Sequence, residues 1–326
     1  MRSSAGVLAL VAVSAAAGAY KELEIREWPV PWEQSRPRDP YVDGQGRVWF
    51  VGQSGNYVAN LDPATGQFRR FELEAGTFPH NLIVSHSGAI WFTGNANGTI
   101  GRLDPATGQV RTFRLPDPAA RDPHTLVEAA NGDLWFTVQG GNFVGKLNPA
   151  SGEFRLVPAP TRGSRPYGIV LDAHGRPWFN LFGTNKLGTI DPATMQLTEV
   201  TIPREAARDR RIAMTSDGKV WYGDYAGGYL GRYDPTTRQF KEWQLPGGAD
   251  SRPYAMTVDD HDNVWVVETG ARPNRFVGFD PRTEQFFGIT PIPSGGDVVR
   301  HMVFHRPTRE IWFGTDANTI GRAKLP

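Results

Sequence analysis

The sequence has 326 residues, among them 37 glycines, 26 prolines, 10 tryptophans and 18 phenylalanines. This composition is typical of short strands joined by tight turns, and it predicts an all-β fold. The formal net charge is +1 and like charges form no runs, which argues against nucleic acid and against a polybasic membrane surface, and leaves a small molecule or a protein as the expected partner. Cysteine is absent, so thiol catalysis, cysteine-ligated zinc and disulfides are excluded.

The first 19 residues have the features of a secretory signal. One arginine precedes an apolar stretch from Ala5 to Ala17, and Ala17 and Ala19 form the small-residue pattern at which signal peptidase cleaves. The stretch is shorter than the roughly 20 apolar residues of a membrane span, although an uncleaved anchor is the alternative. We therefore predict a signal peptide over residues 1–19, a mature chain that begins at Tyr20, and a periplasmic or secreted protein with no membrane span.

A tryptophan recurs along the whole mature chain, with spacings of 42, 44, 43, 43, 44 and 47 residues. The seven positions are Trp49, Trp91, Trp135, Trp178, Trp221, Trp265 and Trp312. Each lies in a unit with four strand-like segments separated by Gly, Asn or Asp-Pro turns, and such a unit is one propeller blade. The sequence thus predicts a single seven-bladed β-propeller domain over residues 20–326, with the tryptophans packed between blades.

The seventh unit has no outer strand of its own, because only four residues follow Ile320-Gly321-Arg322. Residues 25–31 match residues 240–246 in spacing and character. We therefore predict that residues 23–31 complete the last blade and close the ring. A closed ring has no open sheet edge, so a monomer is expected.

The repeats differ in side chain at one position, eleven residues before each Trp, where function is best sought. The seven residues are Arg38, His80, His124, Tyr167, Arg210, Tyr254 and His301. Each should begin an innermost strand, so we expect the set to converge on one mouth of the central channel and to bind a ligand. Three histidines at one position suggest a base, although each could be structural, and Arg38 and Arg210 either bind an anionic ligand or balance carboxylates.

A second set of residues comes four positions after each Trp and should face the same mouth. It comprises Gln53, Asn95, Gln139, Phe182, Tyr225, Thr269 and Asp316, with Asp224 and Glu268 one position earlier. This count places His301 near Asp316 and Glu268, where two carboxylates could hold a divalent cation while a neutral imidazole removes a proton. Alternatively, Asp316 caps its turn and Glu268 pairs with Arg272 or Arg275.

The repeat seen in Pro79-His80, Trp91 to Thr93 and Thr99 to Leu103 resembles that of the streptogramin B lyase (virginiamycin B lyase) family. The resemblance covers nearly all of residues 21–326. It implies a seven-bladed propeller and a magnesium-dependent β-elimination that opens the ester of a cyclic depsipeptide antibiotic. Such a reaction needs a base for a Cα proton and a metal for the developing enolate.

The resemblance to the family's site is partial. Its last blade holds a Glu-Pro-His segment, whose His is the base, and a carboxylate after the Trp-Phe pair; both carboxylates bind the metal. In this sequence His301 matches the base and Asp316 the second carboxylate. The first carboxylate falls on Val299, and a substrate-contacting His of blade six falls on Tyr254. Asp297 or Glu268 could supply the missing ligand, and blade three independently offers Asp122-Pro123-His124, with Gln139 in place of the second carboxylate; neither restores the full pattern.

Two functions of different classes are therefore open. The first is an exported carbon–oxygen lyase in which His301 is the base and Asp316 helps to hold Mg²⁺. The second is a non-catalytic binding or scaffold propeller that captures an anionic or aromatic ligand, or a partner protein, at the channel mouth. A calcium-dependent lactonase would need several carboxylates around one metal, and the mouth offers too few.

Overall fold

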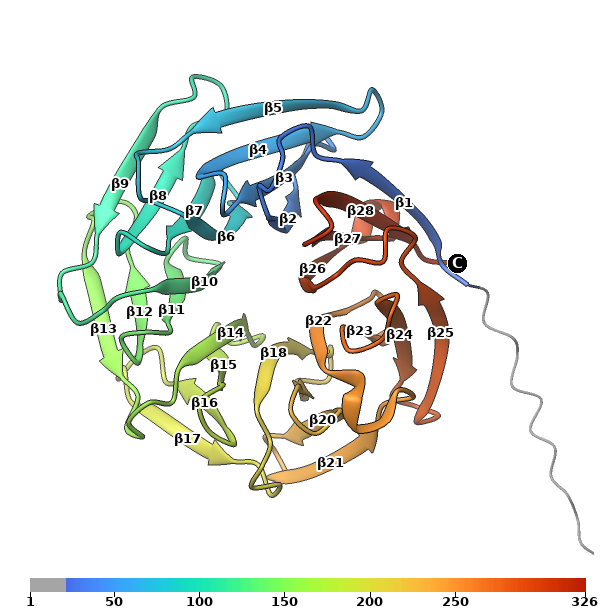
Figure 1. Cartoon of the computed structure of the whole chain (residues 1–326). Coiled ribbons are helices and arrows are strands. Elements are labelled where there is room, and N and C mark those ends of the chain that lie inside the picture. Colours follow the sequence, from blue (N-terminus) through green and yellow to red (C-terminus); the bar gives the residue numbers. More distant parts are fainter. Residues whose placement is uncertain (1–21) are drawn as a thin grey trace, which may run out of the picture.

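The computed structural model describes residues 22–326, and the signal peptide predicted at residues 1–19 lies outside them. Seven four-stranded antiparallel sheets are arranged in a ring around a common axis, and each sheet is one blade (Figure 1). This confirms the predicted seven-bladed β-propeller. Within residues 22–326, no helix is long and apolar enough to cross a membrane.

The strands of each blade follow one another from the axis to the rim. Blade one has β2 (Pro37–Val42), β3 (Val48–Gly52), β4 (Tyr57–Asp62) and β5 (Gln67–Glu72). Blade two has β6 (Pro79–Val84), β7 (Ile90–Gly94), β8 (Thr99–Leu103) and β9 (Val110–Arg114). Blade three has β10 (Pro123–Glu128), β11 (Leu134–Val138), β12 (Phe143–Leu147) and β13 (Phe154–Pro158). Blade four has β14 (Pro166–Leu171), β15 (Pro177–Leu181), β16 (Lys186–Ile190) and β17 (Leu197–Thr201).

The remaining blades carry the two short 3₁₀ helices of the described chain. Blade five has β18 (Asp209–Met214), β19 (Val220–Asp224), β20 (Tyr229–Asp234) and β21 (Gln239–Gln244), followed by η1 (Gly248–Ser251). Blade six has β22 (Pro253–Val258), β23 (Val264–Glu268), β24 (Arg275–Asp280) and β25 (Gln285–Pro291). Blade seven has β26 (Val299–His305), η2 (Arg306–Thr308), β27 (Glu310–Thr315), β28 (Thr319–Lys324) and, from the other end of the chain, β1 (Glu24–Pro29).

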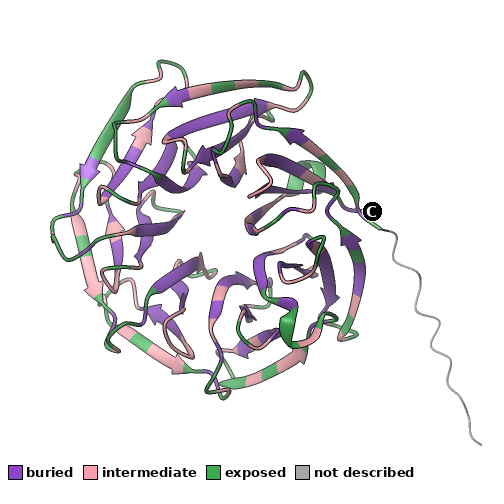
Figure 2. Cartoon of the chain, in the orientation of Figure 1, coloured by how far each residue is buried: buried purple, intermediate pink, exposed green. Residues whose placement is uncertain are grey.

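Exposure is greatest in the outermost strands of the blades, as Figure 2 shows. The second strand of every blade is buried along its whole length, whereas outer strands such as β9 and β21 are largely exposed or half-buried. All seven recurring tryptophans are at most 6% exposed, which confirms that they belong to the core between blades. Gly101 of β8 is required by this packing, because a Cβ there would overlap the ring of Phe92.

The N-terminal strand closes the ring as predicted. β1 pairs antiparallel with β28, with Trp28 opposite Ile320, and the ladder continues where the Val30 N–H donates to the Asn318 carbonyl at 2.9 Å. The Trp28 indole also stacks on Trp312, with ring centroids 5.5 Å apart. The two ends of the described chain are therefore held in one sheet, which has four strands like the others.

Each innermost strand contains a bulge that directs side chains towards the central channel. In six of the seven, the pairing with the second strand shifts register between the first and the fourth residue, as between Pro123 and Leu126. In β2 the shift lies between the second and the fifth residue. Such a bulge frees consecutive residues from the ladder and re-aims their side chains. Every blade thus offers two neighbouring residues, such as His124 and Thr125, to the region around the axis.

Candidate functional site

The pairing register of blade seven changes one member of the expected ring. In blade three Val127 pairs with Trp135, while in blade seven Val303 pairs with Trp312, so the turn between the first two strands of blade seven is one residue longer. Counting back eleven residues from Trp312 therefore stops one residue short of the equivalent position. Arg300, not His301, occupies the position that His124 occupies in blade three.

Two rings of side chains follow from this register. The mouth ring comprises Arg38, His80, His124, Tyr167, Arg210, Tyr254 and Arg300. The inner ring, one residue further along each strand, comprises Asp39, Asn81, Thr125, Gly168, Arg211, Ala255 and His301. The mouth ring thus contains three arginines, two histidines and two tyrosines.

The aromatic members of the mouth ring pack on one another. The imidazoles of His80 and His124 lie 3.6 Å apart between centroids, and His124 lies 3.8 Å from the ring of Tyr167. His80 Nδ1 is 3.0 Å from the carbonyl oxygen of His124. The hydroxyl of Tyr167 forms a hydrogen bond with that of Tyr254. These four side chains are at most 5% exposed, so the structure brings them together in one buried cluster.

The arginines of the mouth ring have unused donors. Arg38 donates from Nε to Asp39 at 3.1 Å and from Nη1 to Gln53 at 2.9 Å, while its buried Nη2 has no hydrogen-bond partner. Arg210 has no carboxylate partner among the described residues; its guanidinium lies over Phe182, Tyr225 and Tyr254 at 4.0 to 4.7 Å, and its buried Nε has no partner. Phe182 and Tyr225 belong to the second predicted set, and both lie beside Arg210 at the mouth.

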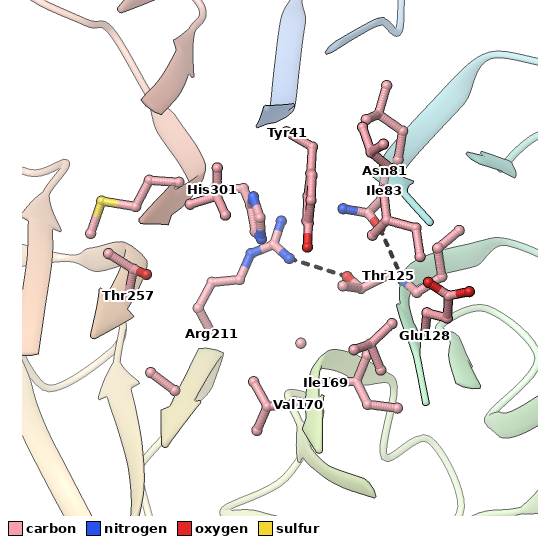
Figure 3. A pocket seen from close by; sticks show the side chains of 18 of the residues that line it. Tyr41, Asn81, Ile83, Thr125, Glu128, Ile169, Val170, Arg211, Thr257 and His301 are labelled. Carbon is pink, nitrogen blue, oxygen red and sulfur yellow. Dashed lines mark hydrogen bonds between the residues drawn. The ribbon is translucent and has the colours of Figure 1, made fainter. Parts of the chain in front are cut away.

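The inner ring contains the residues that the sequence reasoning missed. Arg211 crosses the channel from blade five: Nη2 lies 3.3 Å from Asp39 Oδ2 of blade one, Nη1 donates to Thr125 at 3.1 Å, and Nε donates to the Arg300 carbonyl at 2.8 Å (Figure 3). Asn81 also donates to Asp39, at 2.8 Å. The sequence signal that could have identified Arg211 is the pair of small residues at the equivalent positions of blades four and six, Gly168 and Ala255. Small residues there leave room for one long side chain to cross the channel.

The electrostatics of this network are dominated by the arginines. The pKa of Asp39 is far below its usual value of 3.8, because Arg38 and Arg211 outweigh the effect of its burial. Burial lowers the pKa of His80 and His124 well below 6.5, and nearby guanidiniums lower it further. Burial and then Arg211 lower the pKa of His301 to about 4, and its Nδ1 has no hydrogen-bond partner. All three imidazoles are therefore neutral at pH 7.

The two carboxylates predicted to hold a metal are both engaged by arginine. Asp316 accepts from Arg300 Nη1 at 2.7 Å. Glu268 is fully buried at the end of β23, where it accepts from Arg275 Nε and, at 2.8 Å, from the Gly247 N–H. Within residues 22–326, no three His, Asp or Glu side chains gather in a group that could hold a metal ion. The expected grouping with His301 is thus not formed, and these residues do not fit a magnesium ion.

One further carboxyl at the mouth has a raised pKa. Burial raises the pKa of Asp122 to about 6, although it accepts a hydrogen bond from Asn95. Only Pro123 separates it from His124, so blade three offers an acid and a neutral imidazole two positions apart. A raised carboxyl pKa is common at functional sites but also occurs in structural networks.

The arrangement can be compared with known proteins. The model of the virginiamycin B lyase family matches residues 8–276. A streptogramin B lyase structure is 28% identical, with a TM-score of 0.85 over 94% of this chain and 99% of that one. The virginiamycin B lyase from Staphylococcus aureus is 26% identical, with the same TM-score over 94% of this chain and all of that one, and a catalytically inactive form of it has been solved with quinupristin.

More distant matches share the fold alone. Hydrazine synthase from Kuenenia stuttgartiensis is 13% identical with a TM-score of 0.74, over 90% of this chain and 96% of that one. No curated protein matches the sequence. Because the family model covers well over half of the residues, this chain belongs to the virginiamycin B lyase family.

Proposed function

We propose that this chain is a binding propeller that captures a ligand with an anionic group and an aromatic ring at the mouth ring. The observation that carries the proposal is the position of Arg300, which adds a third arginine to the mouth ring. Arg38 and Arg210 each have a buried guanidinium nitrogen without a partner, and a carboxylate or phosphate would satisfy both. Tyr254 and Phe182 would supply faces for an aromatic ring.

The charges around the mouth favour an anion over a cation. Arg300 and the more exposed Arg36 share one carboxylate, Asp316, at 2.7 and 3.6 Å. The histidines carry no charge at pH 7, so the arginines outnumber the carboxylates that face them. A divalent cation would have to displace an arginine from Asp316 before binding there, which costs more than binding to a free carboxylate.

Calorimetric titration with phenyl phosphate tests the proposal, with phenol and inorganic phosphate as the two halves of the probe. Phenyl phosphate should bind more tightly than either half, and added salt should weaken it. Arg210→Gln should weaken binding roughly tenfold to a hundredfold, since a hydrogen bond to a charged group contributes about 1.5–3 kcal/mol. Arg306→Gln, on the exposed η2, is the matched control. Absence of phenyl phosphate binding, or equal affinities in both variants, would overturn the proposal.

The second candidate function is the carbon–oxygen lyase of the family, and family membership is the observation that favours it. It would need its metal to be held elsewhere than at Asp316 and Glu268, which are paired with arginine. His301 would be its base, because this imidazole is neutral and its Nδ1 is free. Incubation of the protein with a streptogramin B and Mg²⁺ tests it, with product followed by chromatography and by the olefinic signals in its NMR spectrum. Ring opening that is lost in His301→Ala would establish the lyase; an intact antibiotic after long incubation would exclude this substrate.

We also propose that the protein is exported and acts as a periplasmic or secreted monomer. The apolar stretch and small residues before Tyr20 support export. N-terminal sequencing of the protein purified from the cell envelope or medium should begin at Tyr20. Light scattering should give the mass of a single chain, and a chain that retains residues 1–19 or a dimer mass would contradict these two points.

A further inference from the structure

The half of the channel that lies beyond the inner ring is a cavity of about 490 Å³. It opens at the end of the propeller opposite to the mouth ring, because its rim is formed where the innermost strands end, at Val42, Ser85 and Glu128. Its floor is the inner ring, with Asn81, Thr125, Arg211 and His301 in view in Figure 3. The cavity is thus separate from the proposed binding site at the mouth.

The walls of the cavity are apolar. Aliphatic side chains from at least four blades line it, and Met256 is one of them. Figure 3 labels three others, Ile83, Ile169 and Val170. Cavities of this volume hold small molecules and are usually lined by apolar side chains with a few polar groups at defined places. Here the polar groups lie on the floor and at the rim, with Tyr41 and Thr257 as polar side chains between them.

Arg211 on the floor belongs to a buried network that has one more guanidinium than carboxylates, because Asp39 is shared with Arg38 of the mouth ring. The side chains of Arg38, Arg211 and Asp39 are at most 5% exposed, and they comprise two guanidiniums and one carboxylate. Arg211 uses three of its five N–H groups on Asp39, Thr125 and the Arg300 carbonyl. Its other two N–H groups have no hydrogen bond in this network. A buried charge without a counter-charge is costly, so an anion on the floor would stabilise it.

The rim has the opposite polarity. Glu128 lies there, where its carboxylate accepts from the His86 N–H at 2.7 Å and lies 2.9 Å from His86 Nδ1. A negatively charged group near the rim would be repelled by Glu128, whereas on the floor it would meet Arg211 and the free Nδ1 of His301. A ligand with one charged end is therefore oriented with that end inward.

We propose that this cavity binds an amphiphilic carboxylate, such as a medium-chain fatty acid. Its carboxylate would lie on Arg211 and His301, and its unbranched tail would follow the aliphatic walls towards the rim. The inference rests on the charge of the network formed by Arg38, Asp39 and Arg211 and on the character of the walls.

Calorimetric titration with butanoate, hexanoate and octanoate below their micellar concentrations tests the proposal. Each added methylene should tighten binding roughly fourfold, from the free energy of burying a CH₂ group. Octanol has the same tail without the charge, so it should bind at least roughly tenfold more weakly than octanoate. Affinity without chain-length dependence, or octanol binding as tightly as octanoate, would overturn the proposal.

Two variants locate the site. Arg211→Gln should weaken octanoate binding roughly tenfold to a hundredfold. Because that change could also loosen the blade contacts, Thr257→Trp is the second variant: it fills the cavity from β22 and leaves the floor intact. Gln45→Trp adds the same ring outside the cavity as the control. Octanoate binding lost in Thr257→Trp but kept in Gln45→Trp supports the cavity, and unchanged binding in both refutes it.

Discussion

Asp39 is the carboxylate on which the centre of the propeller depends. Its side chain is fully buried, lies between Arg38 and Arg211, and accepts a hydrogen bond from Asn81. The partners come from blades one, two and five, so Asp39 links parts of the ring that share no sheet. Asp39→Asn keeps the shape of the side chain and removes only its charge.

The expected cost follows from the charges that remain. Removal of one partner of a buried ion pair leaves an uncompensated charge and costs about 3–5 kcal/mol. Because asparagine can still accept one hydrogen bond, we expect the free energy of unfolding to fall by about 3 kcal/mol, the lower end of that range. Arg211→Met in the Asp39→Asn background removes one of the two guanidinium charges left without a carboxylate. The double variant should therefore lose about 1–3 kcal/mol less stability than the sum of the two single losses.

The pH dependence gives a second measure. The pKa of Asp39 in the folded protein lies below its usual value of 3.8, so its contribution to stability is complete above that pH and is lost as the pH falls towards the folded value. Wild type should therefore lose stability below about pH 4 more steeply than Asp39→Asn does.

Urea unfolding followed by both tryptophan fluorescence and circular dichroism measures these differences, and coincident transitions justify a two-state treatment. Asp250→Asn, at an exposed position, is the matched control and should change stability by no more than about 0.5 kcal/mol. A cost below about 1 kcal/mol for Asp39→Asn, or strict additivity with Arg211→Met, would refute the reasoning.

Three further predictions concern the core, the ring closure and the mouth. Trp49 donates from its indole to buried Asp43 at 2.8 Å, whereas the indole nitrogen of Trp312 has no partner. In urea unfolding, Trp49→Phe should therefore cost about 1 kcal/mol more than Trp312→Phe. Equal costs would contradict this. Trp28→Ala should lower the free energy of unfolding by about 3–5 kcal/mol, because it removes the indole by which the closing strand stacks on Trp312. A loss below about 1 kcal/mol would show that ring closure contributes little to stability. Burial raises the pKa of Tyr254, but the arginine charges around this phenol lower its pKa below 10 overall. Ultraviolet difference titration should therefore show a phenol that ionises early in wild type and is missing in Tyr254→Phe. Identical titration curves would refute this prediction.

The sequence by itself determined the architecture. Seven tryptophans at a nearly constant spacing identified the blades, and the match between residues 25–31 and 240–246 identified the strand that closes the ring. These features are repeated, and repetition makes a local pattern readable without knowledge of distant contacts. The positions of Arg38, His80, His124, Tyr167, Arg210 and Tyr254 in one ring followed from the same period.

Only the tertiary structure decided which side chains meet at the axis. The longer spacing before Trp312 showed that residues were added, but not that one of them lies in the turn before β27, which moves Arg300 into the ring and His301 behind it. A one-residue change of register redirects every side chain of a strand, so counting along the chain cannot resolve it. Likewise, Arg211 reaches Asp39 across 172 residues of sequence, and the partners that neutralise Asp316 and Glu268 are fixed by packing. The fold therefore follows from the repeat, whereas the charge of the channel follows from contacts that no repeat encodes.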